Sequence, residues 1–281
     1  MNKIAIVGAG SMAEAFISGI LENDLIDRKN IWVTNNSNED RLANLHNHYG
    51  VNTSYDLNTL FTGTDIVILA MKPKDASTAI HYIREYLTEK MLIISVLAGV
   101  SMNTIEVLAN KSLAIVRAMP NTSATVGKSA TAIAVNDRVS KVQIEKTKNL
   151  FGTVGLTTIV EEEQQLDAVT GLSGSGPAYI YYLIEAMENS AAEIGLEKQM
   201  AKELIVQTLI GAAEMVKKSA KSSAQLRKEV TSPGGTTEAG IRILEEHSVQ
   251  QAFISCIKAA TAQSKKLGDT LCSQLAVEKT S

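Results

Sequence analysis

The feature that most constrains this chain is a glycine-rich turn close to its N-terminus. The apolar segment Ile4–Val7 runs directly into Gly8-Ala9-Gly10-Ser11-Met12-Ala13, and apolar residues at helical spacing follow. After a strand, the first glycine permits a tight turn, and the second lets the backbone approach a pyrophosphate at the positive end of the helix. Ala13 replaces the third glycine, which is an accepted variant. This context predicts a dinucleotide-binding site, with a plain strand-to-helix turn as the alternative.

Short apolar segments alternate with helical patterns through the first half of the chain. Such alternation is typical of parallel βαβ units, and strands buried on both faces are continuously apolar, as these are. The expected strands are residues 4–7, 31–34, 66–71, 92–97, 113–116, 130–135 and 156–160, with a helix over residues 140–150 before the last of them. The sequence therefore predicts an α/β fold whose N-terminal part, residues 1–162, is a Rossmann dinucleotide-binding domain.

The composition changes near residue 160, where the β-branched segments end. The expected helices beyond it are residues 178–194, 199–218, 223–230, 236–246 and 249–267. Pro177 is expected in the first turn of the first of them. Residues 163–281 are thus predicted to form an all-helical domain. Because a small helical domain with this many apolar stripes often buries one against a partner chain, we expect a homo-oligomer.

Composition excludes several classes of function. The 281 residues include 27 Lys and Arg against 30 Asp and Glu, and a net charge of −3 argues against binding to nucleic acid or to an anionic membrane. The apolar runs are too short for a spanning helix, and a polar turn interrupts the first apolar run after Val7, so we expect a cytoplasmic protein. The four His and two Cys lack metal-ligand spacing, and no metal site is expected.

The end of the second expected strand bears on the choice of cofactor. An acidic residue there binds the ribose 2′-hydroxyl of NAD and repels a 2′-phosphate. Here Asn35, Asn36 and Ser37 follow Thr34, and no carboxylate precedes Glu39. NADPH is favoured on this ground, with NADH as the alternative, although no arginine stands there to clamp the phosphate. The other interpretation is that these polar residues only form a turn.

Further candidates lie where other strands end. Open α/β sheets bind their ligands at the carboxyl edge. Lys72 follows the strand at residues 66–71, Ala98 and Gly99 follow the next strand, and Met119-Pro120-Asn121 follow the one after that. Lys72 is expected to contact cofactor or substrate, the alternative being a solvated loop position.

Residues 171–177, Gly-Leu-Ser-Gly-Ser-Gly-Pro, lead into an expected helix. A hydrolase elbow is unsupported, because no histidine partner pattern accompanies the serines. The spacing is similar to the GxxGxG of β-hydroxyacid dehydrogenases, but Ile180 occupies the position where those enzymes carry a proton-transferring lysine. The alternative is a close helix contact, which needs glycine for the same steric reason.

A second motif that indicates ligand binding is Ser-Pro-Gly-Gly-Thr-Thr at residues 232–237, which is followed by a helical pattern. Glycines expose backbone amides, hydroxyls add donors, and a helix N-terminus favours an anion by about 0.3 to 1 kcal/mol. This loop suits a small carboxylate. An ordinary N-cap would explain Ser232 or Thr236 alone, but not the two glycines.

Together, these motifs resemble pyrroline-5-carboxylate reductase over nearly the whole chain and in the same order. They are GAGSMAEA from Gly8, LAMKP from Leu69, AMPNT from Ala118, GLSGSGPAY from Gly171 and, most specifically, VTSPGGTTEAGI from Val230. The resemblance implies reduction of L-1-pyrroline-5-carboxylate to L-proline with NADPH or NADH. It also implies a Rossmann domain followed by a helical dimerisation domain like the C-terminal part of 6-phosphogluconate dehydrogenase, in a homodimer or decamer.

The resemblance also implies roles for particular residues. The expected cofactor-binding residues are Gly8, Ala9, Gly10, Ser11, Met12, Asn35, Asn36, Ser37, Met71, Lys72 and Ala98. The expected substrate-binding residues are Ser232, Gly235, Thr236 and Thr237, with the catalytic role given to the hydroxyl of Thr237 at the ring nitrogen. A protonated imine needs no base for an alkoxide, which agrees with Ile180.

Two positions and one run of glutamates limit how far the family pattern carries over. Asn36 stands where many members carry an arginine, and Ser123 stands where proline is common. No role is carried over to the glutamates at 161–163. The open alternatives are another imine reductase, a β-hydroxyacid dehydrogenase relative and a nucleotide-binding protein without turnover.

Overall fold

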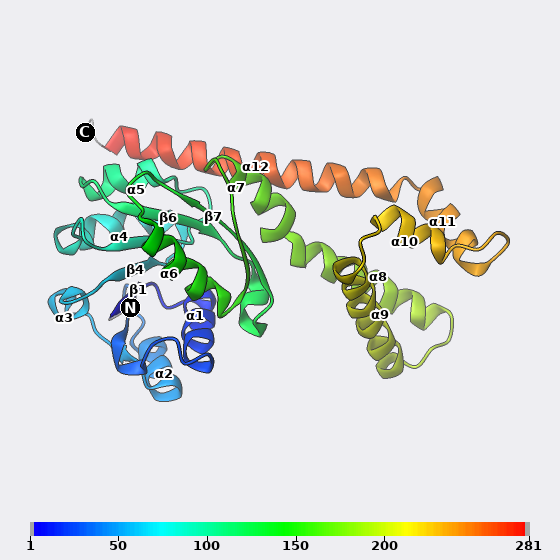
Figure 1. The fold of residues 1–281 in the computed structure, drawn as a ribbon, viewed down its shortest axis with the longest axis horizontal. Coiled ribbons are helices and arrows are strands. Elements are labelled where there is room, and N and C mark those ends of the chain that lie inside the picture. Colours follow the sequence, from blue (N-terminus) through cyan, green and yellow to red (C-terminus); the bar gives the residue numbers. More distant parts are fainter. Residues whose placement is uncertain (1–2, 279–281) are drawn as a thin grey trace. The chain divides into compact units, whose positions relative to one another are not determined.

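A computed structural model describes residues 3–278 of the chain (Figure 1). These residues form two compact units. The first contains the chain up to Gly176 together with the residues from Lys258 onward, and the second is Pro177–Ile257. No helix among the described residues is both long enough and apolar enough to cross a membrane.

An eight-stranded sheet forms the centre of the first unit, in the order β3-β2-β1-β4-β5-β6-β7-β8. The strands are β1 (Ile4–Val7), β2 (Ile31–Thr34), β3 (Asn52–Thr53), β4 (Ile66–Leu69), β5 (Leu92–Ser95), β6 (Ala114–Met119), β7 (Ser129–Val135) and β8 (Gly155–Ile159). The first six strands of the chain, β1 to β6, run parallel to one another. Strand β7 is antiparallel to β6, and β8 is parallel to β7. The strand order reverses between β1 and β4, which is where a Rossmann sheet binds its dinucleotide.

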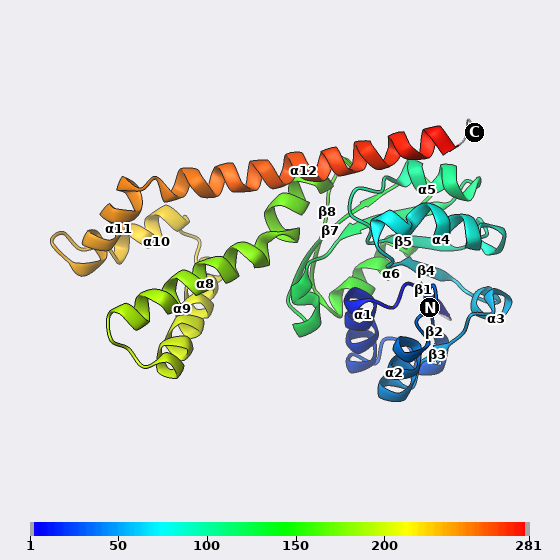
Figure 2. The same ribbon diagram turned by 180° about the vertical axis from the view of Figure 1, so that it is seen from behind.

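Helices cover both faces of this sheet (Figures 1 and 2). Apolar side chains from α1 (Ser11–Glu22), α2 (Glu39–Tyr49) and α6 (Lys141–Gly152) share one core with alternate residues of the strands. In that core Phe16 and Phe151 meet edge to face, with ring centroids 5.1 Å apart. The opposite core contains side chains from α3 (Leu57–Phe61), α4 (Ala76–Ile83), α5 (Met102–Ala109) and α7 (Gln165–Val169). The central strands are therefore buried on both faces, as their apolar sequences require.

Short helical turns connect several of these elements. They are the 3-10 turns η1 (Arg28–Asn30), η2 (Pro73–Asp75), η3 (Arg84–Tyr86) and η4 (Thr122–Val126), and the π-helical turn η5 (Thr170–Gly174). The π-helical turn falls within the glycine-rich segment that precedes α8.

The second unit is helical. Its elements are α8 (Gly176–Glu193), α9 (Lys198–Lys218), α10 (Ser223–Glu229), α11 (Thr236–Glu246) and the first part of α12 (Val249–Glu278), the remainder of which belongs to the first unit. Pro177 lies in the first turn of α8, as predicted. Few side chains are buried within this unit: the buried apolar residues are Ala191, Ala201 and Ile205.

The predicted fold class is confirmed. The expected strands and helices are found within a few residues of their expected ends, except that the last helix, expected over residues 249–267, continues to Glu278. The first continuous segment of the first unit extends to Gly176, and Leu166 of α7 within it is fully buried in the core of the sheet. The division expected at residue 162 stays a prediction.

Candidate cofactor and substrate sites

Gly8 makes the sharp turn after β1. Its φ is +109°, and a Cβ atom at this position would lie 2.5 Å from both the carbonyl carbon of Ala70 and the nitrogen of Met71. Its own N–H donates to the carbonyl oxygen of Thr34 over 2.8 Å, which ties β1 to the end of β2. Only glycine fits a position with this φ and this close a backbone neighbour.

Gly10 has a different role from Gly8. It is the N-cap residue of α1, has extended backbone angles and supplies no side chain to cap the helix. A Cβ atom at Gly10 would meet nothing within 4 Å. The N-terminal amides of α1 are therefore open to an anion from outside the chain, as a pyrophosphate site requires.

Arg41 of α2 fixes the glycine-rich turn. Its Nε donates to the carbonyl oxygen of Ala9 over 2.7 Å, and its Nη2 binds Glu14 Oε2 over 2.5 Å. The Tyr49 hydroxyl donates to Glu14 Oε1 over 3.2 Å. The hydrogen bond from Arg41 is the main cause that lowers the pKa of Glu14, while burial is the main cause that raises the pKa of Tyr49. Arg41 was missed in the sequence, because its partners lie far away along the chain.

A cavity of about 540 Å³ opens at the point where the strand order reverses. Seven of the expected cofactor residues line it: Gly8, Ala9, Gly10, Asn35, Asn36, Met71 and Lys72. Tyr55, Lys74 and Tyr82 line it as well, and no motif in the sequence pointed to them. Ser11, Met12, Ser37 and Ala98 are not among its lining residues. Ser11 and Met12 begin α1, Ser37 lies between β2 and α2, and Ala98 is half-buried after β5.

Asn35 shapes the turn between β2 and α2. Its Oδ1 accepts from the N–H of Asn38 and from the Tyr55 hydroxyl, both over 2.9 Å, and its Nδ2 donates to the carbonyl oxygen of Asn38 over 2.7 Å. These bonds engage both ends of the amide, so Asn36 is the exposed amide at this end of the cavity.

The charges around the cavity suit a phosphorylated dinucleotide. Lys72 and Lys74 stand on its wall beside a single carboxylate, that of Asp75. No carboxylate comes from the end of β2, where an acidic residue would bind the ribose diol of NAD. With the exposed amides of α1, these residues fit NADPH better than NADH.

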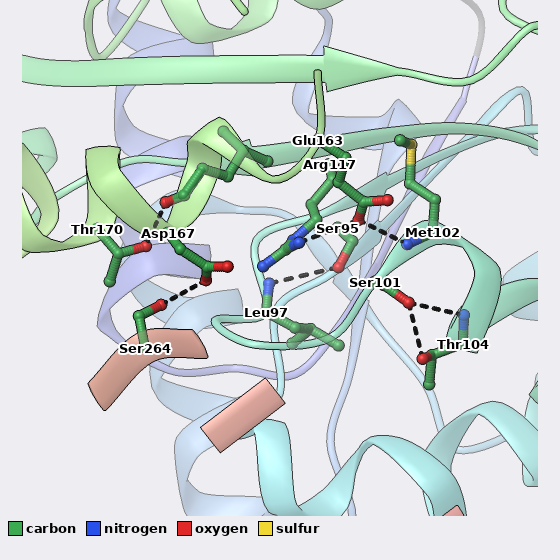
Figure 3. Close-up of polar contacts among 11 residues, drawn as sticks. Ser95, Leu97, Ser101, Met102, Thr104, Arg117, Glu163, Asp167, Thr170 and Ser264 are labelled. Carbon is green, nitrogen blue, oxygen red and sulfur yellow. Dashed lines mark hydrogen bonds and ion pairs between the residues drawn. The ribbon is translucent and has the colours of Figure 1, made fainter. Parts of the chain in front are cut away.

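A buried ion pair lies at the carboxyl ends of β5 and β6 (Figure 3). Arg117 of β6 is 5% exposed, and its Nη1 lies 3.0 Å from Glu163 Oε1. The same oxygen accepts from the N–H of Met102, the first residue of α5, over 2.8 Å. The Nε of Arg117 is buried without a hydrogen-bond partner among the described residues, and leaving such a donor unpaired costs about 1–3 kcal/mol.

Asn121 connects the turn after β6 to the glycine-rich segment. Its Nδ2 donates to the carbonyl oxygen of Ser173 over 3.0 Å, and its Oδ1 accepts from the N–H of Ser123 over 3.1 Å. A Cβ atom at Gly174 would touch the Met119 side chain at 3.5 Å. This is an ordinary van der Waals distance, so packing against Met119 does not by itself require glycine at 174.

The Ser-Pro-Gly-Gly-Thr-Thr loop lies in the second unit. Gly234 has a φ of +72°, and its N–H donates to Glu238 Oε2 over 2.8 Å. Gly235 is the N-cap of α11 and offers no side chain to its first turn, which begins with Thr236 and Thr237. The helix N-terminus is thus left free of a side-chain cap, the arrangement expected for binding a carboxylate.

A cavity of about 870 Å³ adjoins this loop within the same unit. Gly234 and Gly235 line it, together with the cations of Arg227, Lys228 and Arg242 and the carboxylates of Glu238 and Glu245. Ser232, Thr236 and Thr237 are exposed and are not among the residues that line it.

Comparison with known proteins identifies the family. The family model described as pyrroline-5-carboxylate reductase dimerisation matches residues 163–267, and the one described as NADP oxidoreductase, coenzyme F420-dependent, matches residues 3–99. Pyrroline-5-carboxylate reductase 2 of Bacillus subtilis is 49% identical over 267 residues, which cover 95% of each chain.

Two solved structures agree with this match over most of the chain. The pyrroline-5-carboxylate reductase of Coxiella burnetii has a TM-score of 0.87 at 38% identity, covering 95% of this chain and 98% of its own. The Plasmodium falciparum pyrroline carboxylate reductase with NADP bound has a TM-score of 0.86 at 30% identity, with the same coverage. The resemblance noted in the sequence is confirmed, and the chain belongs to the pyrroline-5-carboxylate reductase family.

Proposed function

We propose that this chain reduces L-1-pyrroline-5-carboxylate to L-proline with NADPH or NADH, the last step of proline biosynthesis. The observation that carries the proposal is the presence of two helix N-termini without a side-chain cap, at Gly10 and at Gly235, in a chain that matches a reductase over 95% of its length. One suits the pyrophosphate of the cofactor and the other a small carboxylate.

The first unit would hold the cofactor, which supplies the hydride when bound. Gly8 to Met12 receive the pyrophosphate at the start of α1. Asn36 and Ser37, with Lys72 and Lys74 on the cavity wall, receive the adenosine phosphate. Asn35 acts by shaping the turn. Met71 and Ala98 follow β4 and β5 and are assigned to the nicotinamide side.

The second unit would supply the residues that bind the imine. Ser232, Gly235 and Thr236 hold the substrate carboxylate at the N-terminus of α11. The Thr237 hydroxyl bonds the ring nitrogen and orients the ring. A protonated imine becomes a stable amine without an alkoxide stage, so the chain needs no lysine at Ile180. Catalysis then depends on holding the reactants in place more than on a strong acid or base.

We propose residues 1–162 as the cofactor domain and residues 163–281 as the domain that binds substrate and dimerises. The dimerisation family model begins at residue 163, which supports this division. Homodimers would assemble alone or further into decamers. We place the reaction in the cytoplasm, where an exposed free thiol such as that of Cys256 stays reduced.

The test of this function is the oxidation of NADPH at 340 nm in the presence of DL-pyrroline-5-carboxylate, with NADH at equal concentration in a parallel assay. We expect a turnover of about 1 to 1000 per second, the usual range for enzymes. A higher rate with NADPH would support the assignment of Asn36 and Ser37. Protein that binds NADPH yet shows no rate above the blank would overturn the proposed substrate.

Thr237→Val tests the catalytic assignment. We expect kcat/KM to fall about 10 to 100 fold, from the loss of one hydrogen bond to a group that changes charge. The control is Thr270→Val, because the exposed Thr270 hydroxyl donates within α12, to the carbonyl oxygen of Lys266 at 2.8 Å. A Thr237→Val enzyme within about twofold of wild type would remove Thr237 from the mechanism.

A further inference from the structure

We propose that Arg117 and Glu163 are positioning residues for the nicotinamide half of the cofactor site. The inference rests on the proposed use of NADPH. Neither residue is argued to touch the cofactor. Both act through the loop of residues 96–101, which joins β5 to α5 and contains Ala98.

The ion pair holds the end of that loop, and its arginine belongs to the strand that pairs with the start of the loop (Figure 3). At its start, Arg117 stands opposite Ser95 in the pairing of β6 with β5, and the Ser95 hydroxyl accepts from the N–H of Leu97 over 3.3 Å. At its end, Glu163 Oε1 accepts from the N–H of Met102. Since Arg117 binds the same oxygen, one carboxylate joins β6, the start of α5 and the segment before α7.

The loop occupies the half of the sheet that receives the nicotinamide. In a Rossmann sheet the adenosine lies over the strands on one side of the point where the order reverses, and the nicotinamide lies over the other side. Here β1 and β2 provide the glycine turn and the Asn36 end of the cavity, so β4, β5 and β6 are on the nicotinamide side. A shift of the loop after β5 would therefore disturb the nicotinamide more than the adenosine.

Stability alone is a poor explanation for this pair. Apolar replacements of buried ion pairs are often neutral or stabilising, and the unpaired Nε of Arg117 adds a further cost. The pair Arg138–Glu106 also involves α5, but its side chains are 49% and 24% exposed, against 6% and 20% for Arg117 and Glu163. A costly ion pair on the nicotinamide side is better explained by a role in positioning the loop of residues 96–101.

The test compares two ligands. NADPH contains both halves of the cofactor, whereas 2′,5′-ADP contains only the adenosine half with its phosphates. For Arg117→Met we expect the Kd of NADPH, from fluorescence titration, to rise about 10-fold, the effect of one lost charged hydrogen bond. The Kd of 2′,5′-ADP should stay within about twofold, and kcat should fall more than the KM for the imine.

Two further variants make the test decisive. Arg138→Met removes the exposed pair at α5 and should change neither Kd. Glu163→Gln is nearly isosteric and should also raise the Kd of NADPH without raising that of 2′,5′-ADP. This variant replaces Arg117→Met in the test if circular dichroism shows that Arg117→Met does not fold. Equal weakening of NADPH and 2′,5′-ADP, or an unchanged Kd for NADPH together with an unchanged kcat, would overturn the proposal. Both Kd values are measured without imine, so failure of the proposed reaction does not affect them.

Discussion

Gly8 and Gly10 are two residues apart, yet substitutions at the two positions should have different effects. At Gly8 any side chain would collide with the backbone of Ala70 and Met71, so the fold itself would suffer. At Gly10 a side chain would enter open space above the first turn of α1. A substitution at Gly10 can therefore test cofactor binding without disturbing the fold.

For Gly10→Val we expect the Kd of NADPH to rise at least about 100-fold, because the side chain would occupy the space of the pyrophosphate. The melting temperature should stay within about 2 °C of wild type, as for other substitutions into open space. Fluorescence titration and calorimetry measure the two quantities. Gly152→Val, also in open space but distant from the turn, is the control for binding. An unchanged NADPH affinity in Gly10→Val would rule out this turn as the pyrophosphate site.

The ion pair between Glu14 and Arg41 should stabilise the protein at neutral pH but not in acid. The pKa of Glu14 is lowered by Arg41, so its stabilisation is present above the unfolded pKa of about 4.3 and is lost as the pH falls through the folded pKa. Glu14→Gln should melt below wild type at pH 7, by at most about 4 °C for a partly exposed pair.

This difference should shrink towards zero as the pH is lowered through the folded pKa of Glu14, because the carboxylate is then protonated. Melting curves between pH 3 and pH 7 measure it. Glu85→Gln, which removes an exposed carboxylate paired with Arg84, serves as the comparison. A wild-type advantage that persists at low pH would show that charge at Glu14 is not the cause.

The sequence could identify single residues only where local pattern determines them. Gly8, Gly10 and Lys72 follow strands directly, so their place at the sheet edge could be predicted. Arg41 and Arg117 act through partners 32 and 46 residues away, which no local pattern encodes. A signal for Arg117 did exist, because a lone arginine inside the apolar strand Ala114–Met119 requires a buried partner.

Among elements, β1, β2 and α11 could be predicted with their observed bounds, because their apolar periodicity is clear. The two-residue strand β3 is polar and has no such periodicity. The reversal at β7 also had no signal in hydrophobicity. It follows from the connection of residues 120–128, which is too short for the crossover of about a dozen residues that a parallel partner needs.

Helix α12 makes a backbone contact that constrains one of its residues. A Cβ atom at Gly268 would lie 3.0 Å from the carbonyl oxygen of Gly99, in the loop after β5. Replacing glycine by alanine inside a helix normally stabilises it by about 0.5–1 kcal/mol. At this position the contact should outweigh that gain.

We therefore expect Gly268→Ala to lower the melting temperature. Gly152→Ala, at the end of α6, places its Cβ in open space and should leave the melting temperature equal or higher. Calorimetry on the two variants provides the comparison. A Gly268→Ala protein more stable than wild type would mean that the loop yields to α12 without cost.

At the scale of the whole molecule, the second unit is incomplete as a single chain. Met200, Leu204 and Met215 lie along one side of α9 by their spacing, and they are 44%, 56% and 59% exposed. An apolar stripe of this kind in a family with a dimerisation domain is expected to be covered by a second copy.

Leu204→Glu should convert the oligomer to smaller species, because burying a carboxylate in an apolar interface costs free energy. Light scattering coupled to size exclusion measures the mass. Lys202→Glu changes an exposed residue on the opposite side of α9 and should leave the mass unchanged. A Leu204→Glu protein with the wild-type mass would place the interface elsewhere.

The path of α12 has a consequence for how this chain can be divided. The helix starts in the second unit and ends in the first, where Ser264 donates to Asp167 Oδ1 over 2.7 Å and Gly268 meets Gly99. A fragment that stops at Gly176 would leave the loop after β5 and the side chain of Asp167 without these partners. The nucleotide-binding half therefore cannot be moved to another protein as a continuous segment. A gene fusion or truncation that separates it from the C-terminal helix also removes the contacts that this helix makes with it.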